Sequence, residues 1–326
     1  MIQWLKKNSK LLISILVIAA VVYFFIVEFN KNWQDIQNME LRLNFPFLCV
    51  SVLFVILAYF VNTLTWRYLI NSYHRSLKRI SIKESIAIVN TTQLAKYLPG
   101  KVWSYAVQIY WLAKKGYSKS NVLFVNVVAT ISTLLAASAV GTIMLVSTLN
   151  KISKTGAILY IGLVFLAYAM FILFHTPILN FFIRLANKMM KKEISYVKIS
   201  LKKILITQVL YLFGNVLFCV GGYVLCIAIG LDIDAKLMTV LVGSLLVADV
   251  VGFAVLITPG GLGVRESLMF FIISGVTKQK DVAIIVPIAT RLLTMSVDIF
   301  MGACGFLLGR NTVIYPSNIV DEEPIT

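Results

Sequence analysis

The sequence predicts an all-α integral membrane protein that crosses the bilayer several times. Of its 326 residues, 59% are hydrophobic and only 13% are charged, whereas a typical soluble domain is about 45–50% apolar and about 25% charged. The apolar residues are gathered into runs that are long enough to cross about 30 Å of hydrocarbon as helices. No segment between these runs is long enough to form a separate soluble domain. We therefore expect one transmembrane domain over residues 1–310 and a short cytoplasmic tail over residues 311–326.

The apolar runs occur in eight places, at residues 11–27, 47–64, 122–147, 157–174, 204–229, 238–257, 268–276 and 282–308. A more polar stretch at residues 85–113 is broken in its middle. The first run follows three lysines, as the core of a signal peptide would, but no small-residue cleavage site follows it. We therefore expect it to remain as the first span.

Basic residues are concentrated in the loops, which accounts for the formal net charge of +16 without a nucleic-acid-binding surface. Lys and Arg are enriched before the first run and at residues 67–83, 114–119 and 184–203. The positive-inside rule then places both termini in the cytoplasm, in a multi-pass protein of the cell membrane. Because basic loops flank residues 85–113 on both sides, this stretch should enter and leave on the cytoplasmic face as a re-entrant hairpin.

A second hairpin is predicted at residues 238–276, entering from the opposite face, although residues 238–257 alone are long enough to cross. The expected architecture is therefore about six full spans plus two broken hairpins, with eight spans as the alternative. Hairpins that enter from opposite faces are what an inverted repeat requires. The repeat stays a hypothesis, because the two halves share little sequence.

Each hairpin contains a break made of proline and glycine: Pro99 and Gly100 in the first, and Pro259, Gly260, Gly261 and Gly263 in the second. Proline removes a backbone donor and glycine permits positive φ, so that one helix stops and another restarts. Unpaired backbone at membrane depth is tolerated only where it is buried in protein or lines a wet cavity. In transporters, such breaks indicate the substrate site.

A cation follows each break, Lys101 in the first hairpin and Arg265 in the second. A helix N-terminus carries about half a unit of positive charge, so a cation placed there predicts a site for an anion such as phosphate. Lys96 precedes the first break, and Glu266 either orients Arg265 or partly neutralises it. The alternative is that the glycines only permit close helix packing and that Lys101 extends to the headgroup region. The first break leaves both interpretations open, and the second favours the site.

Three further ionisable residues lie within apolar runs. Asp249 precedes the second break, and Arg291 and Asp298 share one face of the last helix because they are seven residues apart. Ionisable groups at membrane depth either pair with one another or mark a pathway. An ion pair of Arg291 with Asp298 or Asp249 that only joins helices is as consistent with the sequence as a role in translocation. Gln208 and Asn215 also share a face, and we expect them to join helices.

The chain offers little for metal or redox chemistry. Its four cysteines lie within apolar runs and form no CxxC pair, and its two histidines are far apart. We therefore expect no metal and no cofactor.

Four motifs resemble the lysylphosphatidylglycerol synthase transmembrane family, a flippase-like module. They are the strings at residues 66–69, 97–103 and 259–266, of which the last is the most specific, and Arg291 followed by Gly302, Gly305 and Gly309. The resemblance covers essentially the whole chain. It implies a membrane domain that moves a lipid with a charged or glycan headgroup between leaflets. The sequence contains no aminoacyl-transfer domain like that of the family's best-known member, so we expect the chain not to make lysyl-lipid.

The favoured prediction is a lipid flippase, rather than an enzyme, for a phospholipid or a polyprenyl-phosphate lipid. Its headgroup phosphate would be bound at the two broken helices. The residues predicted to bind substrate are Lys96, Pro99, Gly100, Lys101, Asp249, Pro259, Gly260, Gly261, Gly263, Arg265, Glu266, Arg291 and Asp298. One alternative is a membrane-embedded glycosyl- or phosphotransferase that uses Asp249, Glu266 or Asp298. The other is a non-catalytic partner of a lipid- or glycan-synthesis enzyme.

Overall fold

The computed structural model describes a few residues near the N-terminus (Tyr23, Ile26, Val27, Asn30, Trp33 and Gln34) and residues 42–73, 79–97, 103–148, 154–190, 200–255 and 258–310. Every regular element in these ranges is a helix, which confirms the predicted all-α class. The predicted first span, residues 11–27, lies almost entirely outside the described residues.

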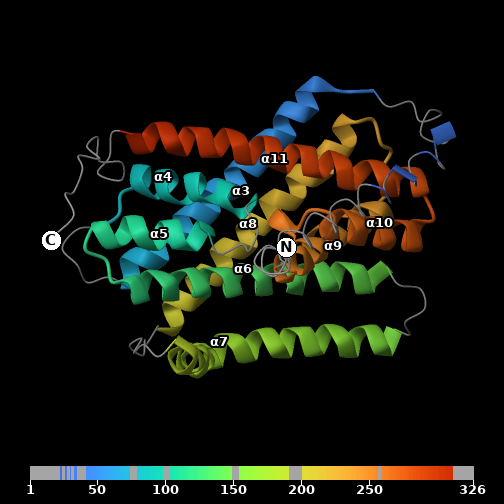
Figure 1. The fold of residues 1–326 in the computed structure, drawn as a ribbon. Coiled ribbons are helices and arrows are strands. Elements are labelled where there is room, and N and C mark those ends of the chain that lie inside the picture. The colour runs from blue at the N-terminus through green and yellow to red at the C-terminus, as the bar shows by residue number, and fades with distance from the viewer. Residues whose placement is uncertain are drawn as a thin grey trace, which may run out of the picture.

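Within the described ranges, five helices are long and apolar enough to cross a membrane (Figure 1). They are α3 (Phe45–Tyr73), α6 (Lys119–Thr148), α8 (Leu201–Ala228), α9 (Ala235–Ala254) and α11 (Lys280–Arg310). Four of them contain runs predicted as full spans. The fifth, α9, has 20 residues and so is about 30 Å long, which is enough to cross by length, as noted for residues 238–257.

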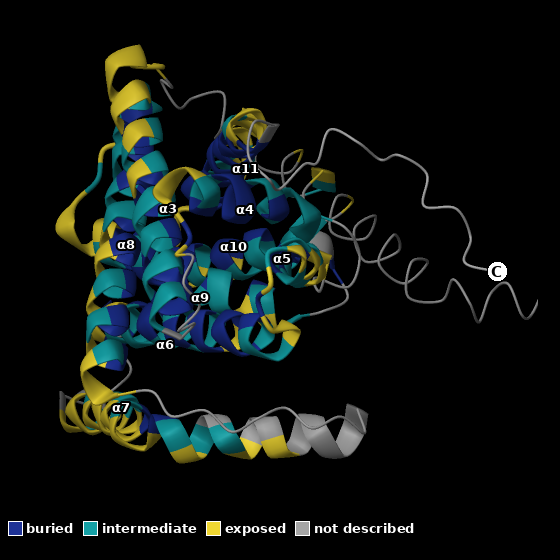
Figure 2. Ribbon diagram, turned by 90° about the vertical axis from the view of Figure 1, so that its left-hand side faces the viewer, coloured by how far each residue is buried: buried dark blue, intermediate teal, exposed yellow. Residues whose placement is uncertain are grey.

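Helix α7 (Lys154–Met190) contains the remaining predicted span, but only residues 158–173 of it form a continuous apolar segment. The helix bends at Phe174 (φ −104°, ψ 20°), three residues before Pro177, where the proline ring crowds the preceding turn. It lies at the edge of the molecule, and much of it is exposed (Figure 2). Its exposed residues include the large apolar Ile158 and Leu163. Such a surface is what a helix facing lipid presents.

The stretch at residues 85–113 folds back on itself as predicted. It consists of α4 (Ile82–Gln93), the 3₁₀ turn η1 (Leu94–Tyr97) and α5 (Trp103–Lys114). Each of the two arms has 12 residues, or about 18 Å of helix, which is too short to cross about 30 Å of hydrocarbon. Glu84, in the first turn of α4, forms an ion pair with Lys115, directly after α5. The chain therefore enters and leaves at the same level.

A capping box begins this first hairpin. The hydroxyl of Ser81 accepts a hydrogen bond from the Glu84 N–H (3.2 Å), and the Glu84 carboxylate accepts one from the Ser81 N–H (2.8 Å). These bonds satisfy donors that the first turn of a helix leaves without a partner.

The second hairpin has one long arm and one short arm. It runs from α9 through η2 (Pro259–Gly261) into α10 (Val264–Thr277), whose 14 residues give about 21 Å of helix. Gly260 and Gly261 have φ angles of 59° and 71°, and a Cβ on Gly261 would lie 2.9 Å from the Gly252 carbonyl oxygen. Only glycine fits this turn, because both the backbone conformation and the close approach exclude a side chain.

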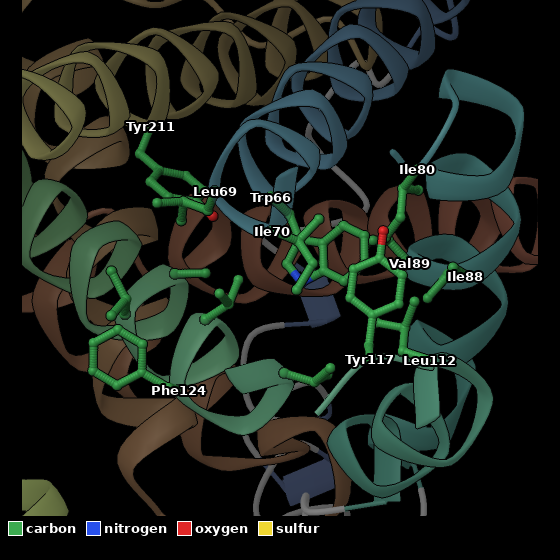
Figure 3. Packing of buried hydrophobic residues seen from close by; sticks show 14 of the residues in the cluster. Trp66, Leu69, Ile70, Ile80, Ile88, Val89, Leu112, Tyr117, Phe124 and Tyr211 are labelled. Atoms are coloured by element: carbon green, nitrogen blue, oxygen red, sulfur yellow. The ribbon is translucent and has the colours of Figure 1, made fainter. Parts of the chain in front are cut away.

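The two hairpins occupy opposite ends of the molecule, and their tips η1 and η2 meet near its centre (Figure 1). Each hairpin has a hydrophobic cluster of its own. Figure 3 shows the first cluster, in which Ile88 and Leu112 from the two arms pack with Trp66 and Ile70 of α3. The second cluster joins α8, α9 and α10 to the beginning of α11.

Small residues allow the long helices to approach closely. The Ser51 hydroxyl of α3 donates to the Gly221 carbonyl of α8 over 2.7 Å. Gly141 of α6 lies against Gly243 of α9, so that a Cβ on either would be within 3.2 Å of the other's carbonyl oxygen. Close packing through glycine is typical of transmembrane helices, where lipid provides no hydrophobic force that favours association.

Helix α11 contacts both hairpins. Gly305 lies against the backbone of α4 and Gly302 lies against Leu94 of η1. The C-terminal half of α11 therefore runs antiparallel to α4, and its N-terminal half packs on α10. A single helix thus reaches both breaks.

Candidate functional site

A cavity of about 330 Å³ lies between the two hairpins, with walls formed by α3, α4, α5, α6, α8 and α9 and by residues at or beside the hairpin tips. Its lining contains many uncharged hydrogen-bonding side chains: Asn62, Thr63, Asn90, Gln93, Ser104, Tyr105, Gln108, Asn126, Thr130, Thr133 and Asn215. The charged residues in the lining are Lys96, Asp249 and Arg265. A cavity lined by so many hydrogen-bonding side chains among apolar helices is the kind of environment in which broken helices are tolerated.

The first hairpin places Lys96 beside this cavity. Its ammonium group forms an ion pair with Asp298 of α11 (2.8 Å), and the Tyr97 hydroxyl donates to the same carboxylate over 2.5 Å. The Asp298 side chain is only 1% exposed, whereas 28% of the Lys96 side chain remains accessible. Asp298 therefore anchors η1 to α11, and Lys96 presents part of its surface to the cavity.

The second hairpin places Arg265 in the lining of the same cavity. Arg265 lies in the first turn of α10, as predicted, and forms an ion pair with Asp249 of α9. Both side chains are partly accessible, 18% for Arg265 and 29% for Asp249. Gly252, one turn after Asp249, makes room for the stem of Arg265, because a Cβ there would overlap its Cγ.

Arg291 of α11 holds the second break in place. Its guanidinium lies 3.4 Å from the Glu266 carboxylate, donates to the Gly260 carbonyl over 3.3 Å and lies over the Tyr97 ring, 5.6 Å from its centre. Glu266 also accepts a hydrogen bond from the Gly263 N–H (2.6 Å), which caps α10. Through Tyr97 and Gly260, Arg291 contacts both hairpin tips.

These contacts correct the predicted ion pairs. Arg291 pairs with Glu266, and with neither Asp298 nor Asp249. Seven residues of helix separate Arg291 from Asp298 by about 10 Å along the axis. Arg291 therefore forms its ion pair with the second hairpin, and Asp298 forms its ion pair with the first. Glu266 caps its helix and forms its ion pair with Arg291, while Arg265 pairs directly with Asp249.

The predicted residues thus divide into two groups. Lys96, Asp249, Gly260 and Arg265 line the cavity, while Gly261, Gly263, Glu266, Arg291 and Asp298 support the two turns from behind. Pro259 begins η2. The predicted residues Pro99, Gly100 and Lys101 lie outside the described residues.

The charges at the site are balanced within the described ranges. Lys96, Arg265 and Arg291 each have a carboxylate partner. The cation at the start of α10 is therefore already neutralised by Asp249. An anion that binds Arg265 therefore has to replace the Asp249 carboxylate.

Sequence reasoning missed most of the cavity wall. Asn62, Asn90 and Asn126 come from three different helices, and each looks like an isolated polar residue in its own run. Asn215 was expected to join helices but lines the cavity. Gln208, by contrast, accepts a hydrogen bond from the Tyr168 hydroxyl (2.7 Å) and links α8 to α7.

A comparison with known protein families identifies the family of the chain. Residues 11–302 match the family model described as the lysylphosphatidylglycerol synthase TM region. No curated protein matches the chain. The family match includes both hairpins, Arg265, Glu266, Arg291 and Asp298, and it covers most of the 326 residues. The chain belongs to the lysylphosphatidylglycerol synthase transmembrane family.

Proposed function

We propose that the protein is a lipid translocase of the cell membrane, with both termini in the cytoplasm. It moves a lipid with a phosphate- or glycan-bearing headgroup between the two leaflets. The observation that carries the proposal is the polar cavity between two broken hairpins that come from opposite ends of the molecule. Each polar group that loses its hydrogen bonds in hydrocarbon costs several kcal/mol. A cavity walled by hydrogen-bonding groups lowers this cost for the headgroup while the acyl chains stay in lipid.

The headgroup phosphate binds at Arg265 in this mechanism. Arg265 offers a planar fork of donors on the first turn of α10, where backbone N–H groups and the helix dipole also favour an anion. The phosphate takes the place of Asp249, whose side chain is 29% exposed and can be solvated within the cavity. Lys96 provides a second cation in the cavity lining. Anion exchange avoids the large cost of leaving a buried guanidinium without a partner. Pro99, Gly100 and Lys101, at the first break, are likewise proposed to bind the headgroup.

The transferase alternative has less support from this geometry. Of the carboxylates in the described ranges, only Asp249 lines the cavity, and it is paired with Arg265. General acid–base chemistry uses a carboxyl group within reach of the substrate. A non-catalytic partner of a synthesis enzyme would not require a polar cavity of this size.

Leaflet transfer in vesicles tests the proposal. The purified chain is reconstituted into liposomes with acyl-labelled fluorescent phosphatidylglycerol, and transfer is followed by chemical quenching of the outer leaflet. We expect faster transfer than in protein-free vesicles. Arg265→Gln should slow it about 10- to 100-fold, the effect of losing a hydrogen bond to a charged group. Arg184→Gln, which removes an exposed arginine near the end of α7, is the matched control. Transfer no faster than in protein-free vesicles would refute the proposal.

A double variant separates anion binding from structural pairing. Arg265→Gln alone leaves Asp249 without its partner, whereas Arg265→Gln with Asp249→Asn removes both charges. We expect the double variant to recover thermal stability but not transfer. Recovery of wild-type transfer would mean that Arg265 serves only to neutralise Asp249.

A further inference from the structure

We infer that the cavity selects lipids whose headgroups carry several hydroxyl groups, such as a sugar or a polyol. This inference rests on the proposed function, and it names the class of lipid that is moved. It comes from the uncharged part of the cavity wall, which the phosphate site does not use. The amides of that part belong to α3, α4, α5, α6 and α8.

The orientation of the Asn126 amide follows from its neighbour. The Trp66 indole N–H donates to the Asn126 oxygen over 2.7 Å, and an indole can only donate. The Asn126 oxygen must therefore face Trp66, so its NH₂ group points elsewhere, and it has no partner among the described residues. Asn126 thus adds a donor to the wall.

The Gln108 amide is oriented in the opposite sense. The Thr92 hydroxyl donates to the carbonyl of Ile88 (2.8 Å), so its oxygen accepts from the Gln108 NH₂ group (2.8 Å). This arrangement leaves the Gln108 oxygen without a partner within the described ranges. Gln108 thus adds an acceptor.

The same reasoning applies to Tyr105. The Thr130 hydroxyl donates to the Asn126 carbonyl (2.7 Å). In the 2.7 Å contact between Tyr105 and Thr130, the donor is therefore the Tyr105 hydroxyl. The half-buried Tyr105 oxygen keeps its acceptor capacity at the cavity.

The wall therefore mixes donors with acceptors. Asn90, Asn126 and Asn215 each have an NH₂ group without a partner in the described chain, while Asn62 and Gln108 have such an oxygen. A phosphate oxygen only accepts and an ammonium group only donates, whereas a hydroxyl does both. Several hydroxyl groups on one headgroup match this wall better than an ion does. The atoms themselves are covered by neighbouring groups, so contact requires a small rotation of each amide.

Aromatic rings complete this surface. Tyr59, Trp66, Tyr105 and Tyr211 also line the cavity. The apolar face of an aromatic ring is suited to pack against C–H groups of a ligand, and Trp66 and Tyr105 keep their polar atoms hydrogen-bonded within the wall. A sugar ring presents C–H groups and hydroxyl groups together, as this wall does.

A panel of acyl-labelled lipids in the same vesicles tests the inference. Glucosyldiacylglycerol has hydroxyl groups and no phosphate, phosphatidylglycerol has both, phosphatidic acid has no headgroup hydroxyls, and phosphatidylethanolamine has an ammonium group. We expect phosphatidylglycerol to be moved at least about fivefold faster than phosphatidic acid or phosphatidylethanolamine, the effect of one net hydrogen bond, and glucosyldiacylglycerol to be moved although it has no phosphate.

Two variants, each on a different helix, test whether the cavity wall causes the preference for hydroxyl-bearing headgroups. Gln93→Met on α4 and Asn215→Leu on α8 remove cavity amides at nearly constant volume. Each should slow transfer of glucosyldiacylglycerol about fivefold, and should slow it more than transfer of phosphatidic acid. Gln208→Met removes a buried amide outside the cavity lining and should not alter the preference. Melting temperatures of the purified variants establish that each is folded.

These measurements distinguish a failure of the proposed headgroup selectivity from a failure of the proposed lipid transfer. Transfer of all four lipids at one rate would overturn the selection for hydroxyl groups and leave translocation standing. Transfer of none would overturn both. Uptake of free radiolabelled glucose by the same vesicles would show that the wall serves a free polyol, which contradicts a lipid-linked substrate.

Discussion

Gly252 leaves the space in which the stem of Arg265 lies. A Cβ at this position would overlap Arg265 Cγ, which is close to the backbone of α10 and cannot simply swing away. A methyl group there would therefore move the guanidinium and disturb its pair with Asp249. In the sequence, Gly252 looks like any other small residue in an apolar helix.

We predict that Gly252→Ala destabilises the protein by about 1–3 kcal/mol, as overpacking does. The apparent Tm in detergent should fall by roughly 2–10 °C. Gly275→Ala is the control, because nothing lies within 4 Å of a Cβ there. It should leave the Tm unchanged or raise it, since alanine favours helix. Equal effects of the two substitutions would contradict the close contact.

The Tyr97 hydroxyl contributes to the attachment of η1 to α11. It donates to a carboxylate that is almost completely buried, and Lys96 pairs with the same group. Hydrogen bonds to charged groups contribute about 1.5–3 kcal/mol.

We therefore expect Tyr97→Phe to lower the free energy of unfolding by about 1.5–3 kcal/mol. Tyr110→Phe is the matched control, since Tyr110 is exposed and surface substitutions change stability by about 0.5 kcal/mol or less. Thermal unfolding of the two variants side by side measures the difference. A Tyr97→Phe variant as stable as its control would show that Lys96 alone holds Asp298.

At the level of elements, the first hairpin is closed at its base by Glu84 and Lys115. Burial alone would raise the pKa of the Glu84 carboxyl, but hydrogen bonds from Lys115 and from the Ser81 N–H outweigh it, so its pKa is lowered. A carboxyl with a lowered pKa in the folded state stabilises the fold above its unfolded pKa, about 4.3. That contribution is lost as the pH falls through the folded pKa.

The expected result is a difference in Tm between wild type and Glu84→Gln that is full at pH 7 and shrinks as the pH falls below about 4. Glutamine still accepts from the Ser81 N–H, so the cap is kept and the ion pair is lost. A difference that is constant from pH 7 to pH 3 would contradict the role of the pair.

For the whole molecule, the path of the chain was easier to predict than its contacts. Loop charge alone indicated that residues 85–113 turn back, because an even number of crossings must join two basic loops. Proline and glycine located both breaks. The partner of Arg291 was not predictable, because Asp298 on the same helix face reaches a different hairpin. Nor was the amide wall, since it forms only when five helices come together.

Two hairpins that come from opposite ends imply a definite pattern of accessibility. Arg79 precedes α4, Lys119 follows α5, and Lys280 begins α11 at the other end; all three are exposed. In a background with its four cysteines replaced, we expect a membrane-impermeant maleimide on intact cells to label Lys280→Cys and neither Arg79→Cys nor Lys119→Cys. In permeabilised cells, the maleimide should label all three.

Labelling of Arg79→Cys and Lys119→Cys alone in intact cells would reverse the orientation of the protein but keep the hairpin. If those two cysteines differ in accessibility, residues 85–113 cross the membrane, and the cavity no longer lies between hairpins from opposite faces.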